Sequence, residues 1–121
     1  MGKFTKLARI AEIEYSDIVI GTHDLGHKLR VYLIDKSFID VFFSEKSKIF
    51  RFSIHWERKH IDNKIFRLDN TPDKKWRDVS TFPLHFHSGE YDKVVIPPFD
   101  TDKKSLEQFV REFLYFVKKI I

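Results

Sequence analysis

Three histidines, one arginine and one aspartate lie in three extended segments in the middle of the chain. They are His55, Arg67, Asp69, His85 and His87. An imidazole titrates near neutral pH, so it can take up or release a proton under working conditions. An arginine binds phosphate through two parallel hydrogen bonds and stabilises charge that develops on it. The combination is typical of general acid–base cleavage of a phosphodiester.

Antiparallel pairing of the first two segments would bring these side chains to one face of a sheet. Side chains along a strand alternate between its two faces, and each segment carries an apolar row and a polar row. The apolar rows must share a face, because a slip by one residue would bury Arg67 and Asp69. We therefore predict that Arg67 lies opposite His55 or Glu57, and that Asp69 lies opposite Ser53 or His55.

The predicted catalytic residues are therefore His55, Arg67, Asp69, His85 and His87. The histidines would transfer protons, Arg67 would hold the phosphate, and Asp69 would fix the tautomer of one imidazole. The alternative is structural: Arg67 and Asp69 form an ordinary pair on an exposed sheet, and the histidines only hydrogen-bond within the fold.

Two histidines separated by one residue also suggest a metal site. His85 and His87 lie on one side of a strand and could share a divalent metal, with Asp69 or His55 as a third ligand. No longer ligand pattern accompanies them, and the chain has no cysteine. Our main hypothesis therefore uses no cofactor, and one divalent metal held by His85 and His87 is the alternative.

The positive charge of the chain is concentrated in one stretch. The net charge is +4, while residues 45–77 hold ten basic and five acidic side chains. Such a concentration favours an anionic partner, here nucleic acid. The alternative is an ordinary solvated surface. The predicted nucleic-acid contacts are Arg51, Arg58, Lys59, Lys74, Lys75 and Arg77.

Several common functional signatures are absent from the sequence. There is no glycine-rich phosphate loop, no Gly-x-Ser-x-Gly and no His-Glu-x-x-His, so ATP hydrolysis, serine-hydrolase chemistry and zincin proteolysis are not expected. No run approaches the roughly 20 apolar residues of a membrane span, and the first residues lack the apolar centre of a signal peptide. We therefore expect a cytoplasmic protein without membrane association.

The pattern of apolar and polar residues predicts an α+β fold around the site. A chain of 121 residues is expected to form a single domain, 1–121. We predict a strongly twisted antiparallel β-sheet, a meander, with a C-terminal helix packed on one face and a short N-terminal helix at residues 3–9. Strands are expected at 10–20, 28–34, 38–43, 50–56, 65–69, 84–87 and 94–96. The strand 38–43 is apolar on both sides, so we expect it to be covered on both faces.

The C-terminal helix is the clearest element. Apolar residues recur from Leu106 to Ile121 with helical spacing, and Ser105 with Gln108 has capping-box spacing. Its apolar stripe is expected to pack on the row Phe50, Phe52, Ile54 and Trp56. Phe116 lies off this stripe and either widens it or contacts a second subunit, so a homodimer remains open.

Several short motifs in these segments resemble those of a known protein family. The residues that match are His55-Trp56, Arg67, Asp69-Asn70, Pro72, Thr81-Phe82-Pro83, His85, His87 and Gly89. They are similar, across residues 28–121, to the TumE-like family of small prokaryotic proteins regarded as toxins of toxin–antitoxin pairs. The family often has histidines directly after the proline, where this chain has Asp73-Lys74.

The resemblance implies a cognate antitoxin as partner and a growth-inhibiting activity. Together with the residues, it leads to the hypothesis of a type II toxin that acts on RNA by metal-independent general acid–base cleavage. Three alternatives remain open. The first is a non-catalytic module that binds nucleic acid or protein, and the second is a histidine-ligated, metal-dependent nuclease. The third is a structural or oligomeric protein with an inert surface.

Overall fold

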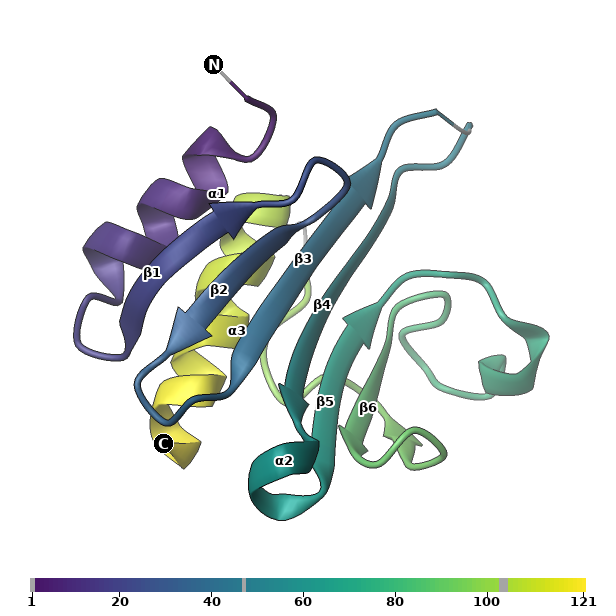
Figure 1. Ribbon diagram of the computed structural model, residues 1–121. Coiled ribbons are helices and arrows are strands. Elements are labelled where there is room, and N and C mark those ends of the chain that lie inside the picture. Colours follow the sequence, from purple (N-terminus) through teal and green to yellow (C-terminus); the bar gives the residue numbers. More distant parts are fainter. Residues whose placement is uncertain (1, 47, 103–104) are drawn as a thin grey trace.

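The protein is built around a seven-stranded antiparallel sheet (Figure 1). The structure is a computed structural model and describes residues 2–46, 48–102 and 105–121. Neighbours in the chain are neighbours in the sheet, so the strands form the predicted meander. The strands are β1 (Val19–Asp24), β2 (Leu29–Leu33), β3 (Phe38–Ser44), β4 (Arg51–Arg58), β5 (Lys64–Asp69), β6 (His85–Gly89) and β7 (Val94–Val95). The helical segments are α1 (Thr5–Arg9), η1 (Ile10–Glu14), α2 (Lys59–Asp62), η2 (Lys74–Trp76) and α3 (Leu106–Ile120). The α+β fold class is confirmed.

Helices α1 and α3 both lie on one face of the sheet (Figure 1). Helix α3 begins at Ser105, whose Oγ accepts a hydrogen bond from the backbone N–H of Gln108, while the Gln108 side chain accepts one from the backbone of Ser105. The predicted capping box is therefore confirmed. None of the helices described in the structure is both long and apolar enough to cross a membrane.

The apolar stripe of α3 packs on the row predicted for it. The Phe109 ring stacks on Phe52 with 5.2 Å between centroids, and Trp56 is fully buried. Phe116 contacts the rings of Trp56 and Phe66, so it widens the apolar side of the helix. Burial of these aromatic rings commits one face of the sheet to the core and leaves the opposite face open.

The strand predicted at 10–20 is wrong in its first half. Residues 10–14 continue α1 as a turn of π-helix, and the strand begins only at Val19. Leu7, Ile10 and Ala11 are buried at helical spacing against the core, so tertiary packing outweighs the β-propensity of the isoleucines. The helix predicted at 3–9 is confirmed by α1.

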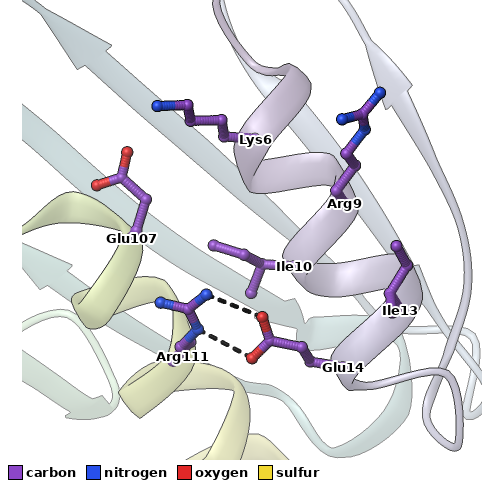
Figure 2. A pocket seen from close by; sticks show the side chains of 7 residues that line it. All are labelled: Lys6, Arg9, Ile10, Ile13, Glu14, Glu107 and Arg111. Carbon is purple, nitrogen blue, oxygen red and sulfur yellow. Dashed lines mark hydrogen bonds and ion pairs between the residues drawn. The ribbon is translucent and has the colours of Figure 1, made fainter.

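Ion pairs join this N-terminal helical segment to α3. The Arg111 guanidinium donates two hydrogen bonds of 2.9 Å to the Glu14 carboxylate (Figure 2). The Tyr15 hydroxyl donates to the backbone carbonyl of Arg111, and Lys118 pairs with Asp17. Figure 2 also shows Ile10 close to the pair, between the two helices. These contacts fix the helix layer on the face remote from the predicted site.

Strand β3 is covered on one face only, contrary to the prediction. Ile39 and Val41 are buried beneath the helices, while Asp40 and Phe42 point to the other face. Over β3, no helix of the described residues packs on that face, so Phe42 remains exposed although it lies between residues that pack in the core. The apolar run of residues 38–43 therefore contains core residues on one face of β3 and an exposed aromatic side chain on the other.

The packing of α3 predicts a large difference between two aromatic residues on the same helix. Phe113 is fully buried, so Phe113→Ala should lower the free energy of unfolding by about 3–5 kcal/mol. Tyr115 is exposed, and Tyr115→Ala should change it by no more than about 0.5 kcal/mol. Urea denaturation measures both, and equal losses would contradict this orientation of α3.

Candidate functional site

The register of the sheet aligns the predicted residues on its open face. Cross-strand partners share a face, and Arg67 pairs with His55 on one side and with His87 on the other. Asp69 likewise pairs with Ser53 and with His85. The predicted register is therefore confirmed. The first of these rows continues through five strands, and its members are Arg30, Asp40, His55, Arg67 and His87.

An open groove of about 470 Å³ crosses this face over β2 to β5. Its lining residues are His27, Lys28, Arg30, Phe38, Asp40, Phe42, Ser53, His55, Glu57 and Arg67. The groove thus contains His55 and Arg67 but not Asp69, His85 or His87. The structure places the five predicted residues on one face but divides them between an open part and a covered part.

The contacts of His55 define its tautomer. Its Nε2 lies 3.2 Å from Oε1 of Glu57, and because a carboxylate only accepts, Nε2 carries the hydrogen. Its Nδ1 faces Nη1 of Arg67 at 3.4 Å, a long contact in which the guanidinium is the donor. Nδ1 therefore holds the lone pair, directed toward the arginine. This arrangement of carboxylate and imidazole is the one that orients a general base in hydrolases.

Electrostatics keep this imidazole neutral. Burial lowers the pKa of His55 below its ordinary value, the hydrogen bond from His55 to Glu57 opposes that change, and the charge of Arg67 reinforces it. Burial also acts on Glu57, but hydrogen bonds from the Lys59 backbone and from His55 hold the pKa of Glu57 below its usual range. An ionised Glu57 beside a neutral His55 is the state that can accept a proton at Nδ1.

Asp69 positions Arg67 and does not contact an imidazole. Its Oδ2 accepts a hydrogen bond of 3.0 Å from Nε of Arg67, and its Oδ1 accepts one of 2.7 Å from the Thr71 backbone. Burial would raise the pKa of Asp69, but the hydrogen bonds from Thr71 and the charge of Arg67 lower it. The carboxylate therefore stays ionised and directs the guanidinium toward His55.

A third carboxylate, Asp40, collects cations on the other side of His55. Arg30 contacts it through Nε and Nη2 at 2.8 and 3.0 Å, and Lys28 Nζ at 2.9 Å. Burial opposes ionisation, but these partners hold the pKa of Asp40 below its ordinary value. With Arg67, the groove is lined by three cationic side chains and by the carboxylates of Asp40 and Glu57. Asp69, which binds Nε of Arg67 beside the groove, brings the carboxylates to three, so the charges balance and each cation is paired.

His85 and His87 lie beneath aromatic side chains. They are 2% and 1% exposed, with ring centroids 5.0 Å apart. Their Nδ1 atoms contact the carbonyl oxygens of Pro83 at 2.9 Å and Tyr91 at 2.6 Å, so each Nδ1 carries the hydrogen. Trp76 contacts both rings, and Tyr91 stacks on His87 at 4.7 Å. The segment of η2 is thus anchored over the pair.

The histidine pair offers its two Nε2 atoms but no third ligand. Within the described ranges, no three histidine, aspartate or glutamate side chains are arranged to hold a metal ion. The oxygens of Asp69, the nearest predicted third ligand, are occupied by Arg67 and Thr71. His55 lies on the far side of Arg67 in the same row.

The six basic residues predicted to contact nucleic acid have different surroundings. Arg58 is buried, pairs with Asp35 and Asp62, and lies over the Trp56 ring at 4.6 Å. It therefore stabilises the turn between β4 and β5. Arg51 is half-buried, and its Nε has no hydrogen-bond partner. The exposed members are Lys59, Lys74, Lys75 and Arg77.

Four groove residues that contact or flank His55 were not predicted from the sequence. They are Glu57, Asp40, Arg30 and Lys28. Strand alternation alone could have found Glu57, because it stands two residues from His55 in the same strand. Asp40 could have been found by pairing the strand 38–43 with 50–56, which sets it opposite His55. Pairing the strand 28–34 with 38–43 would then have placed Arg30 opposite Asp40, with Lys28 two residues away on the same face.

The comparison with protein families decides the affiliation of the chain. The sequence profile of the family described as Toxin TumE matches residues 4–121. The chain belongs to the TumE toxin family. The resemblance over residues 28–121 is thereby confirmed and extends to the N-terminal helix. No curated protein and no solved structure matches the chain significantly.

The two neighbours of His55 should move its pKa in opposite directions. Glu57→Gln removes a hydrogen-bonded negative charge, so the pKa of His55 should fall further. Arg67→Gln removes a repelling positive charge, so that pKa should rise. NMR titration of the imidazole measures both shifts, with Lys119→Gln on α3 as the control. Shifts of the same sign would contradict the contacts described for His55.

The buried histidines should make stability depend on pH. Burial lowers the pKa of both His55 and His87, so the unfolded chain binds their protons first as pH falls below about 6.5. Stability should therefore be fully present above that pH and decrease below it, through the folded-state pKa values. His87→Gln keeps a donor for the Tyr91 carbonyl but does not titrate, so its urea denaturation should depend less on pH. An unchanged dependence would contradict this assignment.

Proposed function

We propose that this protein is the toxin of a type II toxin–antitoxin pair and cleaves RNA in the groove that contains His55 and Arg67. The observation that supports the proposal most directly is the neutral His55, with Nδ1 unprotonated beside the guanidinium of Arg67 in an open groove. Family membership supports the toxin role. The partner would be a protein antitoxin, and the reaction would take place in the cytoplasm.

In the proposed reaction His55 is the general base. Its Nδ1 takes the proton of a ribose 2′-hydroxyl, and the 2′ oxygen attacks the adjacent phosphorus. The bond from phosphorus to the 5′ oxygen breaks, and that oxygen takes a proton from water in the open groove. The hydroxide that forms removes the proton from the His55 imidazolium, which restores the neutral base. The products are a 2′,3′-cyclic phosphate and a 5′-hydroxyl. Glu57 stabilises the imidazolium that forms, as a carboxylate does in a catalytic triad.

Arg67 binds the phosphate in this proposal. A guanidinium matches two phosphate oxygens, and its charge stabilises the negative charge that grows during attack. Asp69 occupies Nε of Arg67 and His55 faces Nη1, so Nη2 and the second hydrogen of Nη1 remain for the ligand. Arg30 and Lys28 lie across His55 and would hold the neighbouring phosphate. The ribose supplies the nucleophile, and the proposal therefore uses no metal ion.

His85 and His87 have a different part in the proposed site. Both rings are covered by Trp76 and Tyr91, so we assign them to holding β6 against Arg67 and Asp69 and not to proton transfer. His87 pairs directly with Arg67 in the sheet, and His85 with Asp69. Substitutions at the pair are thus expected to act through folding and the position of Arg67.

The proposal predicts metal-independent RNA cleavage that needs His55. Purified protein should cleave end-labelled RNA in EDTA, leaving a cyclic phosphate, and His55→Ala should reduce the rate by about 10²-fold or more. His60→Ala is the matched control: His60 is exposed, lies outside the groove, and should be dispensable.

Four results would contradict the proposed reaction. Intact RNA, or equal rates for His55→Ala and the wild type, would remove it. Activity that EDTA abolishes and added divalent metal restores would instead support a histidine-ligated nuclease. Salt-sensitive retention of RNA without any product would support a binding module.

A further inference from the structure

The groove contains an aromatic ring that the fold does not use. Phe42 is 38% exposed and lines the groove on the same face as Asp40. It lies directly across from the small Ser53. Among the described residues, no aromatic ring or cation stacks on Phe42, and it is not part of the core cluster. One face of its ring is thus available to a flat ligand.

Phe50 is a useful comparison, because it is as exposed as Phe42 but packs against other aromatic rings of the protein. It is also 38% exposed, but its ring contacts Phe43 at 5.9 Å and Phe52 at 6.2 Å. It therefore extends the aromatic core on the helix side of the sheet. Exposure alone does not distinguish the two residues, whereas the lack of a stacking partner within the part of the chain that the structure describes distinguishes Phe42.

A second flat surface lies at the other end of the groove. The guanidinium of Arg30 covers the ring of Phe38 at 4.0 Å, and Asp40 holds it there through two hydrogen bonds. A guanidinium fixed in this way presents its own plane outward. Arginine planes and aromatic rings are the two side-chain surfaces on which unpaired RNA bases stack.

The spacing of these surfaces relates them to the proposed reaction. Phe38 and Phe42 are four residues apart on β3, so their Cα atoms are separated by about 13 Å. Asp40 lies midway between them and pairs with His55. Neighbouring bases in a duplex are separated by about 3.4 Å. Two neighbouring bases, one on each surface, must therefore be splayed apart, which only an unpaired strand allows.

We propose that the groove binds single-stranded RNA, with one base stacked on Phe42 and another on the Arg30–Phe38 pair. The phosphate between them then lies over His55 and Arg67. This inference rests on the proposed function and specifies its substrate. A base-paired helix keeps its bases stacked on one another, so it cannot occupy either surface. The protein therefore selects unpaired RNA by stacking and holds it by charge.

Binding of a 2′-O-methyl oligoribonucleotide tests the inference apart from cleavage, because this probe lacks the nucleophilic hydroxyl. Fluorescence anisotropy at fixed salt should show the single strand binding the full-length protein about tenfold or more tightly than its duplex. Phe42→Ala and Phe42→Leu should each weaken single-strand binding about tenfold, because neither keeps the ring. Phe50→Ala, with the same exposure on the opposite face, should bind as the wild type does.

The outcomes separate the two proposals. Equal affinity for single strand and duplex, unchanged affinity in both Phe42 variants, or an equal loss in Phe50→Ala would overturn the stacking inference. If unmodified RNA is still cleaved in that case, the proposed reaction stands without it. Selective single-strand binding that depends on Phe42, with unmodified RNA left intact, would support the inference and contradict the reaction.

Discussion

Burial of one aromatic row beneath α3 is the constraint on which the rest of the structure depends. Phe52, Ile54 and Trp56 face the helix, so every second residue of β4 must face the opposite side. The same alternation passes from strand to strand through the meander. A slip by one residue would bury His55 and Arg67 and expose the tryptophan. The hydrophobic core thus determines which polar residues can meet.

The part of the site that follows from strand parity was predictable. The placement of Arg67 opposite His55 needed only the alternation of apolar residues and the requirement that apolar rows share a face. The segment 10–14 was assigned wrongly, because the burial of Ile10 and Ala11 against the core outweighed a local preference for extended structure. The prediction that β3 is covered on both faces was wrong because it counted every apolar residue of the strand as a core residue. Phe42 is apolar but is exposed and does not belong to the core.

The assignment of each carboxylate to its partner was not accessible from the sequence. Asp69 was expected to orient an imidazole, whereas it holds Arg67, and Glu57 orients His55. Both carboxylates stand two residues from a suitable partner on the same face. The choice depends on side-chain rotamers and on local backbone donors such as Thr71, which parity does not specify. Likewise, only the fold of η2 shows that Trp76 covers the two buried histidines.

The row from Arg30 to His87 crosses five strands, and each member comes from a different strand. No single strand or hairpin carries the whole arrangement, and neighbouring members come together only after their strands pair. A chain that ends before β5 lacks Arg67 and therefore lacks the complete groove. The polar surface is thus a product of tertiary folding and is absent from the separate strands.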